Sequence, residues 1–287
     1  GCVAYFGGGA SAWRTVAIIY AIVGILSNSL SVWSVKELSP EELAEGEIGE
    51  KKQESAETYH LAEAFRLLIH NKYYLMICAS YILMQIYSAT LNMGIYFMTY
   101  VLKNANLLGV FSWAINIPMI VGLLFTPALV AKWKGMYRLN LYGYLLGTVG
   151  RLGVVVAGYM GSVPLMLFGT AVAAIGMSPL QGDMNALIAT CSEYTFLKTG
   201  KRVDGTMYSC TSLGVKLGGG LGTAIAGWML AASGFDGALA VQPESCIRML
   251  YFMYLWLPMG INLVITVILS RMNVEEANER LRNGAKA

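Results

Sequence analysis

Seven long apolar stretches constrain the fold of this chain more than any other feature of its sequence. Each is about 20 residues long or more, the length that an α-helix needs to cross the hydrocarbon core of a bilayer. The stretches are Trp13–Val35, Tyr74–Tyr100, Leu107–Ala131, Leu139–Tyr159, Val163–Ala189, Gly205–Leu230 and Met249–Leu269. The sequence therefore predicts an all-α membrane protein with seven spanning helices.

Composition excludes several classes of protein. Of the 287 residues, 56% are hydrophobic and 13% are charged, whereas about 25% are charged in a soluble domain. The net charge of +3 does not indicate nucleic-acid binding, because the basic residues lie mostly along one side of the membrane. The five cysteines form no C-x-x-C pair, and the chain has no phosphate-binding loop, no H-E-x-x-H and no Ser–His–acid set. We therefore expect no enzyme, metal site or organic cofactor.

The distribution of Lys and Arg predicts the orientation. Most of them fall in the loops on one side, which we assign to the cytoplasm by the positive-inside rule. This places the C-terminus in the cytoplasm and Gly1 outside. The chain begins without an initiator Met, and we expect it to be a fragment.

One connection is long and predicts the domain organisation. Residues 36–72 form a polar, acidic linker whose end, LAEAFRLLIHNK, predicts a short amphipathic helix on the membrane surface, with Leu61, Phe65, Leu68 and Ile69 on one face. We expect one spanning helix in residues 1–35, this linker in 36–72, a six-helix bundle in 73–271 and a cytoplasmic tail in 272–287.

The stretch Gly205–Leu230 has two distinct sides. Gly214, Gly218 and Gly222 recur every four residues and predict close packing against a neighbouring helix. Residues at spacings of three and four form another side, namely Ser209, Ser212, Lys216, Gly219, Gly220 and Thr223. An ammonium at bilayer depth costs roughly 2.5 kcal/mol or more, so Lys216 needs a carboxylate partner or a water-filled cavity.

Two further charges lie within the spans. At a rise of 1.5 Å per residue, Lys216 lies ~16 Å and Asp183 ~9 Å from the cytoplasmic edge, and Arg151 lies near mid-membrane. The depths predict that Asp183 meets Lys216, with Arg151 joining them or extending outward. The cluster is interpreted either as a polar transport pathway or as a structural ion pair.

The run from Ala186 to Gly222 carries a resemblance. Its matching pieces are Glu193-Tyr194, Thr199-Gly200-Lys201-Arg202, Gly205, Tyr208-Ser209 and Lys216 followed by glycines. In order and spacing it resembles the signature of the glycoside–pentoside–hexuronide:cation symporters, the group of the melibiose and glucuronide permeases within the major facilitator superfamily. The resemblance implies a bacterial inner-membrane protein with twelve helices in two halves. This chain would then hold the sixth helix and the complete C-terminal six-helix half.

The resemblance also implies roles for individual residues. Lys216 resembles the family lysine at the centre of the eleventh helix, near the sugar and cation sites. Thr211, Ser212 and Val215 fall where that helix faces the sugar cavity, and Gln181 stands about where the melibiose permease has a sugar-facing tryptophan.

A cytoplasmic gate is implied by the same run. Arg202 matches a loop arginine associated with gating, and Glu193 matches the second acid of a D-x-x-[DE]-Y pattern. The first acid is replaced by Thr190, and Asp183 matches no motif of the family.

The function expected from these features is symport of a sugar, glycoside or hexuronide with Na⁺ or H⁺ by alternating access. The family's cation site lies mainly on the N-terminal half, so that half is an expected partner, together with the sugar and the lipid bilayer. The alternatives are a seven-helix receptor, which the long linker disfavours, and a membrane enzyme or other non-transporting protein.

Overall fold

The computed structural model describes residues 5–34, 61–201 and 203–284, and this part of the chain is helical, without a β-strand. Residues 35–60, which include most of the linker and His60, lie outside the described residues, as does Arg202. The chain divides into two units, residues 1–59 and 60–287. The first unit contributes helix α2, Gly9–Ser34, which is long and apolar enough to span a membrane.

The second unit contributes six more helices of spanning length, so the described residues hold the seven spans that hydropathy predicts. In chain order the spans are α5–α6–η1 (Lys72–Asn92, Gly94–Tyr96, Phe97–Val101), α7 (Leu107–Trp133), α8 (Met136–Tyr159), α9 (Val163–Thr199), α10–α11–η2–α12 (Asp204–Met207, Ser209–Leu213, Gly214–Gly218, Gly219–Ala232) and α13–η3–α14 (Glu244–Tyr251, Phe252–Trp256, Leu257–Leu269). The elements labelled η are π-helical turns inside longer helices. Two shorter helices, α4 (Leu61–His70) and α15 (Val274–Gly284), precede and follow the spans.

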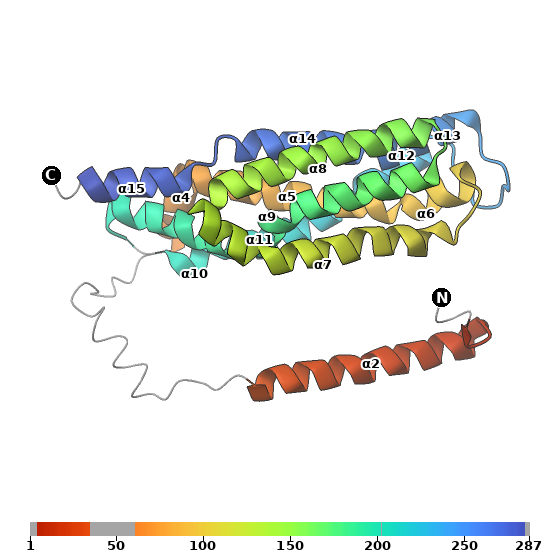
Figure 1. Cartoon of the computed structure of the whole chain (residues 1–287), viewed down its shortest axis with the longest axis horizontal. Coiled ribbons are helices and arrows are strands. Elements are labelled where there is room, and N and C mark those ends of the chain that lie inside the picture. The colour runs from red at the N-terminus through yellow and green to blue at the C-terminus, as the bar shows by residue number, and fades with distance from the viewer. Residues whose placement is uncertain (1–4, 35–60, 202, 285–287) are drawn as a thin grey trace. The chain divides into compact units, whose positions relative to one another are not determined.

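The six spans run side by side along the long axis of the unit, with α4, α10 and α15 together at one end (Figure 1). We refer to this end as the α15 end. Helix α5 packs against the α11–α12 span and against α14, and α9 packs in the same way against α7 and α8. The first span of the unit thus packs against the fifth and sixth, and the fourth span packs against the second and third. The packing thus has the pattern expected of two related three-helix repeats.

Glycines set the closest approach between α8 and α9. A Cβ atom placed on Gly143 would lie 2.5 Å from the carbonyl oxygen of Gly176, and one on Gly150 would lie 2.6 Å from the backbone nitrogen of Ala173. Helices in lipid associate through such small residues, because apolar side chains gain little from exchanging lipid contacts for protein contacts.

Helix α9 extends beyond the predicted span. The apolar stretch ends at Ala189, but the helix continues through Glu193 and Lys198 to Thr199. No helix-breaking residue occurs between Ala189 and Gly200, so the backbone remains hydrogen-bonded beyond the apolar stretch. Gly200, at φ +71°, ends the helix in the left-handed conformation that glycine adopts without a Cβ clash.

Helix α4 forms where the amphipathic pattern predicts it. Ala64 and Leu68 are buried in the apolar core of the α15 end, whereas Phe65 and Ile69 are exposed. Asn71 follows α4 and caps α5, its side-chain oxygen accepting the N–H groups of Tyr73 and Tyr74. The two helices therefore meet without an intervening loop.

Candidate functional site

The span α10–α12 packs against α5 through its glycine ridge. A Cβ atom on Gly214 would lie 2.6 Å from Cβ of Tyr81, one on Gly218 would lie 2.7 Å from the carbonyl oxygen of Ile82, and one on Gly222 would lie 2.8 Å from Cβ of Ala89. These distances are shorter than ordinary van der Waals contacts between such atoms. The sequence-based prediction of a close helix pair is confirmed, and the partner is α5.

Two other sides of this span are exposed. One side is polar and carries Ser209, Ser212, Lys216 and Thr223. The other side is apolar and carries Leu213, Leu217, Leu221 and Trp228. A leucine-rich exposed side suits lipid, whereas hydroxyl groups and an ammonium need water or polar partners. The polar side therefore requires surroundings other than lipid.

Lys216 lies within η2, the π-helical turn Gly214–Gly218. Such turns occur frequently at functional sites, because the wider turn redirects side chains and frees backbone groups. Lys216 is exposed, and no ion pair is recorded for it among the described residues. The side chain of Val215 is half exposed beside it, and the Thr211 hydroxyl donates to the Tyr208 carbonyl at 2.8 Å.

Asp183 corrects the prediction that it meets Lys216. Its carboxylate is buried at 7% exposure and accepts both of its recorded side-chain hydrogen bonds from Nδ2 of Asn140, at 2.8 and 3.0 Å. Asn140 lies on α8, so the carboxylate points into the α8–α9 contact, whereas Lys216 lies on the exposed side of its own span. Similar depth did not bring the two together, because their helices present them in different directions.

Arg151 corrects the prediction that it joins these charges or extends outward. It is buried at 3% exposure, donates from Nη2 to the hydroxyl of Tyr87, and lies 4.9 Å from the centroid of the same ring. No carboxylate is recorded as its partner in the part of the chain that the structure describes. The π-electrons and hydroxyl of Tyr87 thus replace an acid as the partner of this guanidinium.

Between Asp183 and Arg151, α8 carries further polar groups on its buried side. The Thr148 hydroxyl lies 3.1 Å from the Thr266 hydroxyl and accepts from Asn262 Nδ2 at 3.4 Å, while Thr266 also approaches the Tyr144 carbonyl at 3.4 Å. We call this set the polar seam, and it consists of Tyr87, Asn140, Tyr144, Thr148, Arg151, Asp183, Asn262 and Thr266.

The polar seam is incompletely hydrogen-bonded. Buried atoms without a partner include Asn140 Oδ1, Tyr144 Oη, Arg151 Nε and Asn262 Oδ1. An unpaired buried polar atom costs about 1–3 kcal/mol, so such groups are usually satisfied by water or explained by function. The seam is therefore a candidate site, in addition to the exposed polar side around Lys216.

On α9, Gln181 is exposed, and Asn185 one turn later is exposed as well. The Tyr208 hydroxyl donates to the carbonyl of Asn185 at 3.4 Å, which links this part of α9 to the start of the Lys216 span. Exposed amides of α9 and exposed hydroxyls of the Lys216 span thus lie near this link.

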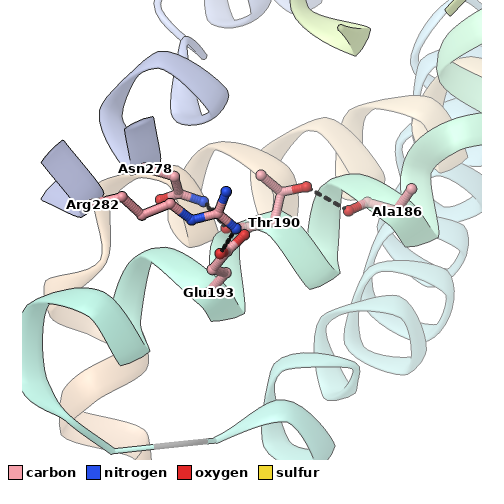
Figure 2. Close-up of polar contacts among 5 residues, drawn as sticks. All are labelled: Ala186, Thr190, Glu193, Asn278 and Arg282. Atoms are coloured by element: carbon pink, nitrogen blue, oxygen red, sulfur yellow. Dashed lines mark hydrogen bonds and ion pairs between the residues drawn. The ribbon is translucent and has the colours of Figure 1, made fainter. Parts of the chain in front are cut away.

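The α15 end holds an ion pair between a span and the C-terminal helix (Figure 2). The carboxylate of Glu193 on α9 accepts from Arg282 of α15, and Asn278 of α15 donates to Glu193 at 3.4 Å and to the Thr190 carbonyl at 3.0 Å. Arg202, the other residue predicted for this gate, lies outside the described residues.

Glu275 adds a second link from α15 to the spans. Its carboxylate accepts the N–H groups of Met136 and Tyr137 at 2.9–3.0 Å, at the N-terminus of α8 where the N-cap Gly135 offers no side chain. An anion at a helix N-terminus satisfies free N–H groups and complements the helix dipole. Helix α15 is therefore fastened to both α8 and α9.

Beside Glu193 is a pocket of about 410 Å³ between α9 and the start of the Lys216 span. Its lining includes Glu193, Asp204 and Tyr208. The carboxylate of Asp204 accepts a hydrogen bond from the Ser192 hydroxyl. The described residues contain no group of three His, Cys, Asp or Glu side chains suited to a metal ion.

Asp183, Arg151 and Glu193 were singled out from the sequence, but their partners in the polar seam and on α15 were not predicted. Asn140, Tyr144, Thr148 and Arg151 recur along α8 at spacings of four and three, and that pattern was a usable signal for a polar helix side. Glu275, Asn278 and Arg282 have the same spacing on α15. Their partners lie far away in the sequence and are identified only by the packing.

Comparison with known proteins places these features in context. Residues 3–276 match the family described as MFS/sugar transport protein. The chain is 25% identical over 261 residues to the isoprimeverose transporter of Lactiplantibacillus pentosus. It is 31% identical over 159 residues to the uncharacterized symporter YnaJ of Bacillus subtilis, and 31% identical over 155 residues to the glucuronide carrier protein homolog of Escherichia coli.

These matches cover 89%, 55% and 53% of this chain, respectively. They cover 52% of the isoprimeverose transporter, 34% of the symporter and 33% of the glucuronide carrier homolog. The chain thus spans about half the length, or less, of the curated relatives that it matches.

Proposed function

Because this chain belongs to the MFS/sugar transport protein family, we propose that it is part of a secondary transporter that moves a sugar or glycoside together with a cation. The chain is a multi-pass membrane protein, with seven helices long and apolar enough to span a bilayer. Transport in such a fold proceeds by alternating access, in which two bundles rock around a site near the middle of the membrane.

The observation that carries this proposal is the exposed polar side around Lys216. The glycine ridge fixes the opposite surface of the span against α5, so the ammonium and hydroxyl groups point away from the six-helix bundle. In the proposed transporter this side lines an aqueous cavity shared with a second bundle. Thr211, Ser212, Val215 and Lys216 then contact the sugar or the coupling cation from this span, and Gln181 contacts the sugar from α9.

The partner of this surface in the proposal is the N-terminal half of the same transporter. Residues 1–35 supply the last helix of that half, residues 36–72 link the halves, and residues 73–271 form the C-terminal bundle. The positive-inside rule places the α15 end, with residues 272–287, in the cytoplasm of a bacterial plasma membrane.

The substrate class is supported by the names of the relatives. They include a transporter of isoprimeverose and a homolog of a glucuronide carrier. We therefore place the substrate among sugars, glycosides and hexuronides. An ammonium in a polar cavity suits such a ligand, because it donates hydrogen bonds to hydroxyl, ether or carboxylate oxygens.

A cytoplasmic gate is assigned to the ends of α9 and α10. The proposal makes Glu193 a gate residue whose ion pair with Arg282 holds α15 against α9, and it makes Arg202 a second gate residue.

Uptake measurements on the complete protein test the proposal. Lys216→Ala is expected to abolish uptake of the radiolabelled sugar or to remove its dependence on a cation gradient, with the amount of protein in the membrane unchanged. Lys132→Ala removes an exposed lysine near the end of α7 and serves as the matched control, with uptake close to that of the parent. Cation-dependent uptake at the parental rate in Lys216→Ala would refute the assignment of the cavity.

A further inference from the structure

The contact between Asp183 and Asn140 contains a donor–acceptor mismatch. Both carboxylate oxygens accept from the same amide nitrogen, at 2.8 and 3.0 Å, while the amide oxygen Asn140 Oδ1 is buried without any partner. An ionised carboxylate offers only acceptors, so it cannot satisfy a second acceptor beside it.

We propose that Asp183 and Asn140 form a proton-binding site within the spans, in which Asp183 takes up and releases a proton. In the protonated form the acid O–H donates to Asn140 Oδ1, and the amide N–H donates to the acid carbonyl. In this reciprocal pair the acid O–H and C=O and the amide C=O and one amide N–H are all hydrogen-bonded, and only the second amide hydrogen is left over. Deprotonation removes the donor and leaves the arrangement seen in the structure, with Oδ1 unpaired.

A proton fits this contact better than a metal cation does. Hard cations are held by several oxygen ligands, whereas the oxygen atoms of this contact are those of one carboxylate and one amide. Asn140 is 1% exposed, and one turn further along α8 Gly143 lies in close contact with Gly176 of α9.

Charged groups on the neighbouring helices do not neutralise Asp183. On α15, Glu275 is bound to the N–H groups at the start of α8, one turn before Asn140. Asp204 of α10 accepts from Ser192. Lys132 of α7, Arg138 of α8 and Lys72 of α5 also lie on helices near this end; all three are exposed, and none of them forms an ion pair with Asp183 among the described residues.

The position of the site gives the proton a route. Asn140 lies one turn from the N-terminus of α8, so the pair lies close to the α15 end of the bundle. From Asn140 the polar seam continues along α8 through Tyr144 and Thr148 to Arg151. The role of this proton in coupling rests on the proposed transport function, whereas the site itself does not.

Infrared difference spectroscopy of the purified, complete protein in lipid tests the site directly. Spectra taken between acidic and alkaline pH are expected to show the C=O band of a protonated carboxyl group that disappears on titration. Asp183→Asn, which keeps the size of the side chain, is expected to abolish this band. Glu244→Gln removes an exposed carboxylate at the opposite end and is expected to leave the band unchanged.

Asn140→Leu distinguishes a positioned acid from an isolated one. Removing the amide frees the acid carbonyl from a hydrogen bond, so the band is expected to move to higher frequency. Identical spectra for the parent and Asp183→Asn would overturn the proposal, as would a band that persists at all pH values. Sugar uptake measured on the same preparation tests the proposed transport function separately from the proton-binding site. A protein that does not transport sugar could still show the titrating carboxyl band of Asp183.

Discussion

The glycine ridge between α5 and the Lys216 span allows a quantitative prediction for the double variant Gly218→Ala/Gly222→Ala. The added methyl groups would lie 2.7–2.9 Å from atoms of Ile82, Gln85, Ile86 and Ala89, three of which are backbone atoms. Comfortable separations between such carbon atoms are about 3.5–4.0 Å, so the helices must move apart by up to ~1 Å.

Overpacking of this kind costs roughly 1–3 kcal/mol per site. Replacing glycine by alanine in a helix returns about 1 kcal/mol per site. The two sites together cost roughly 2–6 kcal/mol and return about 2 kcal/mol, so we expect a net loss of up to about 4 kcal/mol for the pair. At roughly 2–4 °C per kcal/mol, the melting temperature of the purified protein falls by up to about 16 °C.

The matched control is Gly219→Ala/Gly220→Ala in the same helix. Neither position has any atom within 4 Å of an added Cβ, so the control is expected to match or exceed the stability of the parent. Thermal unfolding in detergent, followed by the fraction of monodisperse protein, measures both pairs. Equal melting temperatures for the two double variants would refute the packing argument.

Three further predictions concern single contacts. Glu275→Ala removes the acceptor for two N–H groups at the start of α8 and is expected to cost about 1–2 kcal/mol of stability. Glu279→Ala, on the exposed side of α15, is expected to cost little. Equal losses of stability would contradict the role of Glu275 as the cap of α8. Tyr87→Phe removes a hydrogen bond to a buried cation and is expected to cost about 1.5–3 kcal/mol in thermal unfolding, and this cost is expected to shrink in an Arg151→Met background. Asp183→Asn and Lys216→Ala are expected to change the melting temperature additively, because the structure does not place these residues in contact. A strongly non-additive double variant would instead support the ion pair that the sequence predicted.

The spans themselves were predictable because each is set by a local property. A run of apolar residues determines where a helix crosses lipid, and the four-residue repeat of glycines determines which side of the Lys216 span packs closely. The apolar run and the glycine repeat are each visible within a single segment of the sequence. The same locality explains the error at the end of α9, because the apolar stretch ends at Ala189 although nothing interrupts the helix before Gly200.

The polar contacts were not predictable, because they depend on which helix sides meet. Asp183 and Asn140 are 43 residues apart, and Arg151 and Tyr87 are 64 residues apart. Depth along a helix axis suggested the pair of Asp183 with Lys216, but depth does not determine direction around the axis. Only the packing of α8 against α9, made possible by their glycines, selected Asn140 as the partner of Asp183.

Water accessibility of the Lys216 span tests the central claim most directly. In the complete protein, with Cys2 replaced by serine, Ser212→Cys and Leu217→Cys place single thiols on the polar and the apolar exposed sides of this helix. The other cysteines are buried, namely Cys78, Cys191, Cys210 and Cys246. A membrane-impermeant, charged maleimide applied to sealed vesicles of both orientations is expected to label Ser212→Cys, with protection by the transported sugar, and to leave Leu217→Cys unlabelled. Equal labelling of the two thiols, or labelling of Leu217→Cys alone, would contradict an aqueous pathway along the side that carries Lys216.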